Sequence, residues 1–212
     1  MRKQARVVVV GSGIVGCAAA YHLARFGWDD ILVIDKGELY ENDGSTSHAP
    51  GGVVPLSHNK LLTEMGTYTS QLIASLEHFT NDRNTWHKVG QLEVCASEKR
   101  MQDMVRLHGT AKGFGHATEI LNARETVARL PLLDENEIVG SLFVPQGMIV
   151  KGAHVSGALA RDAMATGRVD FVGHARMTDI EVQHGAVVAV LTDHPELPRI
   201  ECEHVLLAAN IW

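Results

Sequence analysis

The chain has 212 residues, of which 45% are hydrophobic and 21% charged, a balance typical of a globular protein with one ordinary domain or two small ones. Nineteen basic and twenty-five acidic side chains give a net charge of −6 without a basic run, so no nucleic-acid partner is expected. No apolar stretch reaches the roughly twenty residues needed to cross a bilayer, so no membrane partner is expected either.

The first expected element is a buried parallel strand at Val7–Val10, because these four apolar residues are β-branched. The strand leads directly into Gly11–Gly16, which has the G-x-G-x-x-G spacing. In such a turn Gly11 permits the tight bend, Gly13 lets a pyrophosphate approach, and Gly16 lets the next helix pack on the strand. The run therefore predicts a dinucleotide site.

A helix is expected from about Ile14 to Phe26, with Gly27 as its C-terminal stop. Its first turn would offer free N–H groups and the positive end of the helix dipole to the phosphates. The basic residues Arg2, Lys3 and Arg6 before an apolar stretch also resemble a secretion signal. The glycine turn interrupts that apolar stretch and is explained only by the dinucleotide interpretation, so export is not expected.

A second strand, Ile31–Ile34, ends at Asp35, nineteen positions after Gly16. A carboxylate there can accept hydrogen bonds from both hydroxyls of an adenosine ribose and would repel a 2′-phosphate. NADP is therefore disfavoured. The motif alone does not separate FAD from NAD.

Small residues dominate the next notable segment, which has neither a helical nor a strand period and is expected to be a loop. Its glycines and proline suit close approach to a flat ligand, and its three hydroxyls could face phosphate and ribitol oxygens. The segment reads Gly44, Ser45, Thr46, Ser47, His48, Ala49, Pro50, Gly51, Gly52.

The middle of the chain predicts a helix from Ser57, as N-cap, to about His78, with an apolar stripe assigned to the core. A half-buried strand at Trp86–Cys95 is expected to open a substrate-facing region. The elements predicted next are a helix at 98–112 capped by Ser97, a short helix with a capping box of Asn122 and Glu125 that is closed by Pro131, and a strand at 138–144.

The last third predicts a helix from Val155 to Thr166, ended by Gly167, and four strands. The strands are expected at 169–172, 176–182, 187–191 and 205–209. The layout indicates an α/β fold: a Rossmann-like βαβ unit with a β-meander, interleaved with part of a smaller antiparallel α+β substrate domain. The expected divisions are 1–84 and 151–212 for the nucleotide domain and 85–150 for the substrate domain.

From Val7 to Trp212 the chain resembles, in order, the dimethylglycine and sarcosine dehydrogenases and oxidases, FAD enzymes of the D-amino-acid oxidase type. The most specific part is Ser45–Gly51. In that family the histidine at this place in the motif carries FAD through the flavin 8α-methyl group. The resemblance thus implies that FAD is bonded covalently to His48.

The resemblance also implies the other cofactor contacts. It assigns the pyrophosphate turn to Ile14 and Val15 beside Gly11, Gly13 and Gly16, the adenosine-ribose end to Asp35 and Lys36, the flavin loop to Gly44–Gly52, the adenine-facing backbone to Met177, and the strand that returns to the cofactor to the segment ending at Ile211 and Trp212.

At the end of the chain, Asn210 stands where the resembled family commonly has glycine. Asparagine tolerates a positive φ better than most residues, so the turn is expected to survive. The family's substrate-holding groups, and the tetrahydrofolate region of some members, lie largely beyond this point. The sequence therefore predicts an N-terminal fragment, and no catalytic acid or base is assigned within it.

Chemistry supports His48 independently of the family. Bond formation needs a neutral imidazole as nucleophile, and the ordinary histidine pKa near 6.5 makes that form abundant at neutral pH. An attached flavin cannot dissociate and, with less electron density at the 8α position, becomes a stronger hydride acceptor. These properties suit the oxidation of an N-methyl amine.

Other site classes are not indicated. The twelve histidines form no H-x-x-x-H or H-E-x-x-H pair on a predicted helix, and no serine stands in a G-x-S-x-G elbow, so neither a metal site nor a serine triad is expected. Cys17, Cys95 and Cys202 form no C-x-x-C pair and suit a reducing compartment, the cytoplasm or, in a eukaryote, the mitochondrial matrix.

The main hypothesis is an enzyme that oxidises an N-methylated glycine, such as dimethylglycine or sarcosine, by hydride transfer from the N-methyl carbon to flavin N5. Electrons would then pass to oxygen or to an electron-transfer flavoprotein. Three alternatives stay open: a flavoprotein acting on another amine or a hydroxy acid, an NAD-dependent dehydrogenase, and a non-catalytic or incomplete nucleotide-binding fragment.

Overall fold

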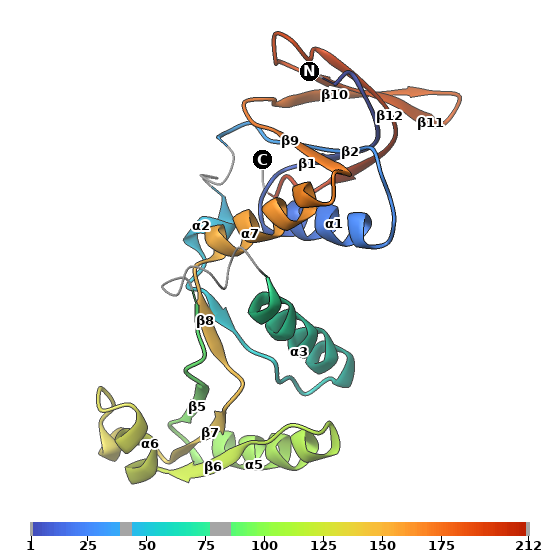
Figure 1. The fold of residues 1–212 in the computed structure, drawn as a ribbon. Helices are drawn as coiled ribbons and strands as arrows, with labels where there is room; N and C mark the ends of the chain where they lie inside the picture. The colour runs from blue at the N-terminus through green and yellow to red at the C-terminus, as the bar shows by residue number, and fades with distance from the viewer. Residues whose placement is uncertain (1, 39–43, 77–85, 211–212) are drawn as a thin grey trace. The chain divides into compact units, whose positions relative to one another are not determined.

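The computed structural model describes residues 2–38, 44–76 and 86–210. The chain divides into two compact units. Unit 1 consists of Met1–Pro50, Leu76–Thr85 and Lys151–Trp212, and unit 2 of Gly51–Ser75 and Trp86–Val150. Mixed parallel and antiparallel sheets with flanking helices confirm the predicted α/β fold (Figure 1).

Unit 1 is built on a six-stranded sheet with the order β10-β11-β12-β1-β2-β9. Strands β12, β1, β2 and β9 are parallel, whereas β10, β11 and β12 form an antiparallel meander. The strand bounds are β1 Gln4–Val10, β2 Ile31–Ile34, β9 Val169–Val172, β10 Met177–Gln183, β11 Ala186–Thr192 and β12 Arg199–Leu207.

Strand β12 belongs to both halves of this sheet. Its first residues, Arg199–Glu201, pair with β11, and from Glu201 to Leu207 it runs parallel to β1. The strand is therefore longer than the predicted 205–209, because a single chain serves the meander and the parallel part. Its carboxyl end lies beside the end of β1, where Ala208 N–H donates to the Val10 carbonyl at 2.8 Å.

The helices of unit 1 are α1 (Ile14–Arg25), the four-residue α2 (Ser45–His48) and α7 (Gly152–Ala165). Helices α1 and α7 lie side by side against the parallel strands (Figure 1). Small buried residues such as Gly16, Ala20 and Ala160 allow this close packing. The predicted stop at Gly27 is confirmed, because this glycine has a φ of +87°.

The core of unit 1 forms where the strands are buried on both faces. Val8, Leu32, Ile34, Val190 and Ile200 belong to one cluster that joins the parallel strands to the meander. The four-residue apolar runs at 7–10 and 31–34 predicted this burial, because a strand covered on both sides has no polar face.

Unit 2 contains two three-stranded antiparallel sheets, with the orders β3-β8-β4 and β5-β7-β6. The bounds are β3 Gly52–Val53, β4 Trp86–His87, β5 Gln91–Cys95, β6 Glu119–Asn122, β7 Gly140–Val144 and β8 Met148–Val150. Its helices are α3 Lys60–Ser75, α5 Glu98–Gly113, α6 Ala123–Arg129 and the 3-10 turn η1 Glu135–Glu137.

The helix caps predicted for α5 and α6 in unit 2 are confirmed. Ser97 Oγ accepts from Arg100 N–H at 3.3 Å at the start of α5. Asn122 Oδ1 accepts from Glu125 N–H, and the Glu125 carboxylate accepts from Asn122 N–H, both at 2.9 Å, which completes the capping box of α6. The single strand predicted at 86–95 is instead two, because Gly90, with a φ of +76°, bends the chain between β4 and β5.

Residues 51–75 were placed with the nucleotide domain by the sequence, but the structure groups them with unit 2. Two contacts explain this grouping. Strand β3 pairs with β8, and Leu56 enters the core formed by Cys95, Met104 and Leu142. Local patterns could not show this, because the partners lie 39 positions (Leu56 to Cys95) to 97 positions (Gly52 to Ile149) further along the chain.

Two predictions about α3 were wrong. The helix begins at Lys60, and its cap is Asn59, whose Oδ1 accepts from Leu62 N–H at 3.2 Å, rather than Ser57. The apolar stripe assigned to the core is exposed at its first three positions, at 63% for Leu61, 57% for Met65 and 51% for Tyr68, whereas Leu72 is half-buried and Leu76, directly after the helix, is buried as predicted. The buried positions of this helix are Thr63, Ser70 and Ile73, so apolar spacing identified the helix but not its buried face.

The exposure of α3 can be tested with one substitution at two positions. In the 212-residue chain, Leu61→Ala should change the free energy of unfolding by less than about 0.5 kcal/mol, because this side chain is already in water. Leu142→Ala removes a fully buried side chain from the core of the same unit and should cost about 2–5 kcal/mol. Denaturant unfolding measures both, and similar losses for the two variants would mean that the Leu61 face is covered.

Candidate dinucleotide site

The turn after β1 leaves no room for side chains at two of its glycines. Gly11 has a φ of +107°, and a Cβ there would lie 2.5 Å from the Ala208 carbonyl oxygen. A Cβ on Gly16 would lie 1.8 Å from the Gly11 carbonyl oxygen. Gly11 thus allows the end of β12 to lie close to the turn. Gly16 allows the start of α1 to pack against the turn, as the G-x-G-x-x-G spacing predicted.

The N-terminus of α1 lacks a cap from its own residues. Gly13, at the N-cap position, has no side chain to offer, and the first turn contains no acidic residue. The predicted phosphate contacts Ile14 and Val15 begin this helix, and Val15 is exposed. The backbone N–H groups of this first turn and the positive end of the dipole suit an anion at this place.

Asp35, which directly follows β2, stabilises the turn by hydrogen bonds. One carboxylate oxygen, Oδ2, accepts from Ser12 N–H at 2.6 Å and from Ser12 Oγ–H at 2.8 Å, and the other, Oδ1, accepts from Gly37 N–H at 3.0 Å. The sequence predicted a ribose acceptor here and missed the bonds to Ser12. The G-x-G pattern could have indicated them, since a serine between the glycines faces the end of the neighbouring strand.

The segment before β10 lies beside the same strand end. His174 N–H donates to the Gly37 carbonyl at 2.9 Å, and Ala175 N–H donates to the Asp35 carbonyl at 2.7 Å. The predicted adenine-facing residue Met177 begins β10 two positions later. The predicted Lys36, which is exposed, lies between the two acceptor residues. The structure therefore brings the predicted ribose and adenine segments together.

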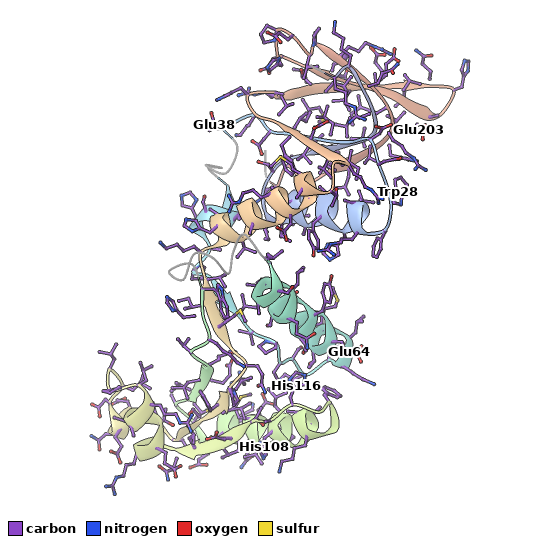
Figure 2. All side chains as sticks on the ribbon, in the orientation of Figure 1. Trp28, Glu38, Glu64, His108, His116 and Glu203 are labelled. Carbon is purple, nitrogen blue, oxygen red and sulfur yellow. The ribbon has the colours of Figure 1, made fainter. Side chains whose placement is uncertain are left out.

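Sequence reasoning missed a side-chain contact between the segments that follow β2 and β9. His174 Nε2 lies 2.8 Å from Glu38 Oε2, and His174 has a φ of +53°. Figure 2 shows Glu38 just past β2, at the opposite end of that strand from Trp28. No local motif pairs positions 38 and 174, so only the adjacency of β2 and β9 could reveal the contact.

The small-residue segment is not a loop at its start. Ser45–His48 form the short helix α2, partly because Ser47 Oγ–H donates to the Gly44 carbonyl at 3.0 Å. Thr46 Oγ1 accepts from Ile14 N–H at 3.0 Å and thereby caps α1 from outside. The prediction of a loop was wrong for these four residues, because the Ser47 hydroxyl satisfies the carbonyl before the turn and the Thr46 hydroxyl joins the turn to α1.

Two close approaches surround α2. A Cβ on Gly13 would lie 3.1 Å from Thr46 Oγ1, and a Cβ on Gly152, the first residue of α7, would lie 2.4 Å from the Thr46 carbonyl oxygen. Helix α2 therefore lies against the N-termini of both α1 and α7. The role of Gly152 was missed, although a glycine at the start of a helix is a signal of close approach.

His48 ends α2 with an exposed imidazole. Its Nδ1 lies 3.0 Å from the Gly44 carbonyl oxygen and 3.1 Å from Ser47 Oγ. A carbonyl oxygen only accepts, so Nδ1 carries the proton in the neutral ring. The lone pair is then on Nε2, which is the nitrogen free to act as a nucleophile.

The residues after His48 serve the fold of unit 2. A Cβ on Gly51, which has a φ of +82°, would lie 1.8 Å from the Val150 carbonyl oxygen, and Gly52 pairs with Ile149. The fold of unit 2 thus explains the glycines at these two positions, in addition to the predicted approach of a ligand. Ala49 and Pro50 form the extended link before them.

Asn210 adopts the predicted positive φ, at +57°, so the turn after β12 forms without glycine. Its side chain reaches the start of α2, where Nδ2–H donates to Ser45 Oγ at 2.5 Å. The neighbouring residues Ile211 and Trp212, predicted as cofactor contacts, lie outside the described residues.

Two further findings concern the described residues 2–38, 44–76 and 86–210. No group of three histidine, cysteine, aspartate or glutamate side chains could hold a metal ion there. No helix in these ranges has the length and apolarity that crossing a membrane requires.

Cys17 lies beneath the turn and is fully buried. Its thiol donates to the Ser12 carbonyl at 3.0 Å. Burial, and secondarily the charge of Asp35, raise the pKa of this thiol from 9.0 to about 12. The thiol is therefore neutral and unreactive at neutral pH, and it supports the turn as a packed group.

The comparisons with known proteins cover almost the whole chain. A family model described as "FAD dependent oxidoreductase" (DAO) matches residues 6–212. The mitochondrial pyruvate dehydrogenase phosphatase regulatory subunit of Mus musculus is 29% identical over 209 residues, which are 99% of this chain and 23% of that protein. The mitochondrial sarcosine dehydrogenase of Mus musculus is 28% identical over 198 residues, which are 86% of this chain and 21% of that protein.

The chain spans less than a quarter of the length of these two relatives. Among solved structures, L-proline dehydrogenase from P. horikoshii superposes with a TM-score of 0.88 at 20% identity, covering 100% of this chain and 54% of that one. At this identity the likeness concerns the fold.

The state of the Cys17 thiol gives a pH-dependent prediction. Above pH 9 the unfolded chain loses this proton while the folded chain keeps it until about pH 12, so the stability contributed by the neutral thiol falls across that window. The slope should approach about 1.4 kcal/mol per pH unit. Urea unfolding at pH 8, 9 and 10 should show a steeper decline for the native chain than for Cys17→Ala. Equal slopes would contradict the raised pKa.

Proposed function

The chain belongs to the family of FAD-dependent oxidoreductases, and on this basis we propose that it forms the FAD-binding part of an enzyme that demethylates an N-methylated glycine, such as sarcosine or dimethylglycine. The observation that carries the proposal is the position of His48 on α2, with its Nε2 free, on a helix that touches the N-terminus of α1. A dinucleotide on the glycine turn and a flavin beside this imidazole account for both features.

The described residues fit the cofactor at three places. The N-terminus of α1 would offer Ile14 and Val15 to the pyrophosphate, on a turn whose shape excludes a side chain at Gly11 or Gly16. Asp35 and Lys36 hold the adenosine ribose, next to the backbone before Met177.

Residues 44–52 hold the flavin, with the hydroxyls of Ser45, Thr46 and Ser47 at the polar part of the molecule and His48 at its rim. When bound, FAD would supply a hydride acceptor for the N-methyl carbon of the substrate, and water or tetrahydrofolate would intercept the iminium product.

The protein's contribution is to orient the cofactor and to keep the proton of His48 on one ring nitrogen. The Gly44 carbonyl keeps the proton of His48 on Nδ1, which directs the lone pair of Nε2 outward. Asp35 binds the turn after β1, and Thr46 on α2 binds Ile14, the first residue of α1. These two residues thereby fix the turn and α2 relative to each other, and they position both the phosphate end and the flavin end of the cofactor. No catalytic acid or base is assigned to the 212 residues.

The substrate class rests on the name of one relative and on chemistry. Sarcosine is an N-methylated glycine, and a sarcosine dehydrogenase is among the proteins that this chain resembles. Both named relatives are mitochondrial, and the three cysteines are free thiols, so we place the protein in a reducing compartment, the cytoplasm or the mitochondrial matrix. The electron acceptor in this proposal is oxygen or an electron-transfer flavoprotein.

The regulatory subunit among the relatives favours a second candidate, a flavoprotein that regulates a phosphatase. That relative matches 99% of the chain, slightly more than the sarcosine dehydrogenase does. A shared cofactor-binding half does not by itself determine whether the bound flavin turns over.

The covalent anchor can be tested by replacing His48. In the protein at its full natural length, yellow colour and flavin fluorescence should stay with the polypeptide after acid precipitation, and His48→Ala should retain only flavin that is released into the supernatant. His204→Ala, on β12 in the same unit, is the matched control and should keep its flavin. A native peptide spanning residues 44–52 should be heavier by one FAD in mass spectrometry; flavin that leaves the native protein would contradict the bond.

The substrate class can be tested by anaerobic bleaching of the flavin absorbance. Sarcosine or dimethylglycine at millimolar concentration should bleach the holoprotein within minutes, whereas lactate and glycolate should not, because the proposed donor is an N-methyl carbon. Bleaching by the hydroxy acids alone would overturn the amine assignment. If none of these compounds bleaches a fully loaded holoprotein, the result supports the regulatory candidate.

A further inference from the structure

Asn210 occupies a place that the topology of unit 1 creates. Strand β12 runs parallel to β1, and the bond from Ala208 N–H to the Val10 carbonyl keeps the two chains together as both reach the carboxyl edge of the sheet. Asn210 follows two residues later in a left-handed conformation, with a φ of +57°. The turn directs its side chain back to the start of α2.

The side-chain bond from Asn210 Nδ2–H to Ser45 Oγ, at 2.5 Å, joins positions 165 residues apart. Ser45 is the first residue of α2, and none of the four residues of this helix is buried. A single helical turn is not stable by itself, because nucleation costs more than one hydrogen bond returns. Polar contacts from outside therefore hold α2 in place.

Two such contacts are described, and they act on neighbouring residues. Ile14 N–H binds Thr46 Oγ1 on the side of α1, and Asn210 binds Ser45 on the side of β12. His48 lies at the other end of the same turn, and its ring is oriented by the Gly44 carbonyl, directly before Ser45. A shift of Ser45 moves Gly44, and with it the acceptor that orients the imidazole.

We propose that Asn210 is a positioning residue for His48: its bond to Ser45 holds α2 so that Nε2 of the imidazole faces the 8α carbon of the flavin. This inference rests on the covalent anchor proposed above. The proposal predicts that the Asn210 side chain speeds formation of the His48–flavin bond. The side chain should contribute little to reversible binding of FAD, because it contacts α2 rather than the phosphate turn.

The bond-forming step balances as follows. A C–H bond of the 8α methyl group breaks and the bond from the 8α carbon to Nε2 forms. The methyl group and the imidazole each release one proton, and the two electrons of the broken bond pass to dioxygen, which with the two protons becomes hydrogen peroxide. The reaction therefore needs only FAD, the protein and air.

The experiment follows this reaction in time. Apoprotein of the full natural length, made in a riboflavin-starved host, is mixed with FAD in air, and samples are stopped in denaturing detergent and separated on a gel. In-gel flavin fluorescence then gives the rate of covalent attachment. Quenching of free-flavin fluorescence immediately after mixing gives the reversible affinity for FAD in the same samples.

Three single variants and the double variant Asn210→Gly/Ser45→Ala separate the side chain from the backbone. Asn210→Gly keeps the positive φ and removes the donor, so attachment should slow about fivefold to tenfold, the effect of losing one hydrogen bond, while reversible affinity changes less than threefold. Asn210→Asp should restore much of the rate, because its carboxylate can accept from the Ser45 hydroxyl. Ser45→Ala should slow attachment like Asn210→Gly, and the double variant should be no slower than either.

Each result decides the question. Attachment at the native rate in Asn210→Gly, or slowing in the double variant equal to the product of the single effects, would overturn the positioning role. Equal losses of reversible FAD affinity and of attachment rate would show a general disruption of the fold and would also overturn it. If the native protein itself forms no covalent adduct, the proposed bond between His48 and FAD is wrong, and the positioning role of Asn210 is wrong with it.

Discussion

The structure depends most on how Asp35 holds the turn between β1 and α1. Its two carboxylate oxygens accept three hydrogen bonds, from the backbone and side chain of Ser12 and from the backbone of Gly37. Charge-assisted bonds of this kind are stronger than neutral ones, and here they join the ends of two parallel strands. The glycine turn is thereby rigid before any ligand is present, which reduces the entropy lost on binding.

The same edge of the sheet collects the other parts of the site. Parallel strands end on one side, so β1, β2, β9 and β12 deliver their following residues to a common region of unit 1. The ligand-binding positions of open α/β sheets lie outside such carboxyl ends. Helix α2 joins this region through hydroxyl groups rather than apolar packing, and Thr46 caps α1 with an oxygen that a phosphate could replace.

Unit 2 is stabilised differently. Its core around Leu56, Cys95, Met104 and Leu142 joins segments that are distant in sequence, and its strands are antiparallel. Helix α3 belongs to this unit but exposes Leu61, Met65 and Tyr68. Apolar periodicity therefore identified a helix correctly but assigned these three residues to the core wrongly, because a repeat of 3.6 residues reveals an apolar face but not what covers it.

The sequence by itself determined what depends on neighbouring residues. The buried strands at 7–10 and 31–34, the strand at 169–172, the glycine turn, the stop at Gly27 and the capping box of Asn122 and Glu125 all follow from local sterics, hydrogen bonding and β-branching. Asn210 is of the same kind, because its tolerance of a positive φ belongs to the residue itself.

Only the tertiary structure decided which of these local features meet. The bonds of Asp35 to Ser12, Ile14 to Thr46 and Asn210 to Ser45 span 23, 32 and 165 positions, and no periodicity or spacing connects them. The helical form of Ser45–His48 follows from such contacts, since four small polar residues have no intrinsic reason to form a helix. Long-range hydrogen bonds depend on strand order and register, which many sequences with the same local pattern could satisfy in different ways, and that is why the geometry around His48 came from the fold alone.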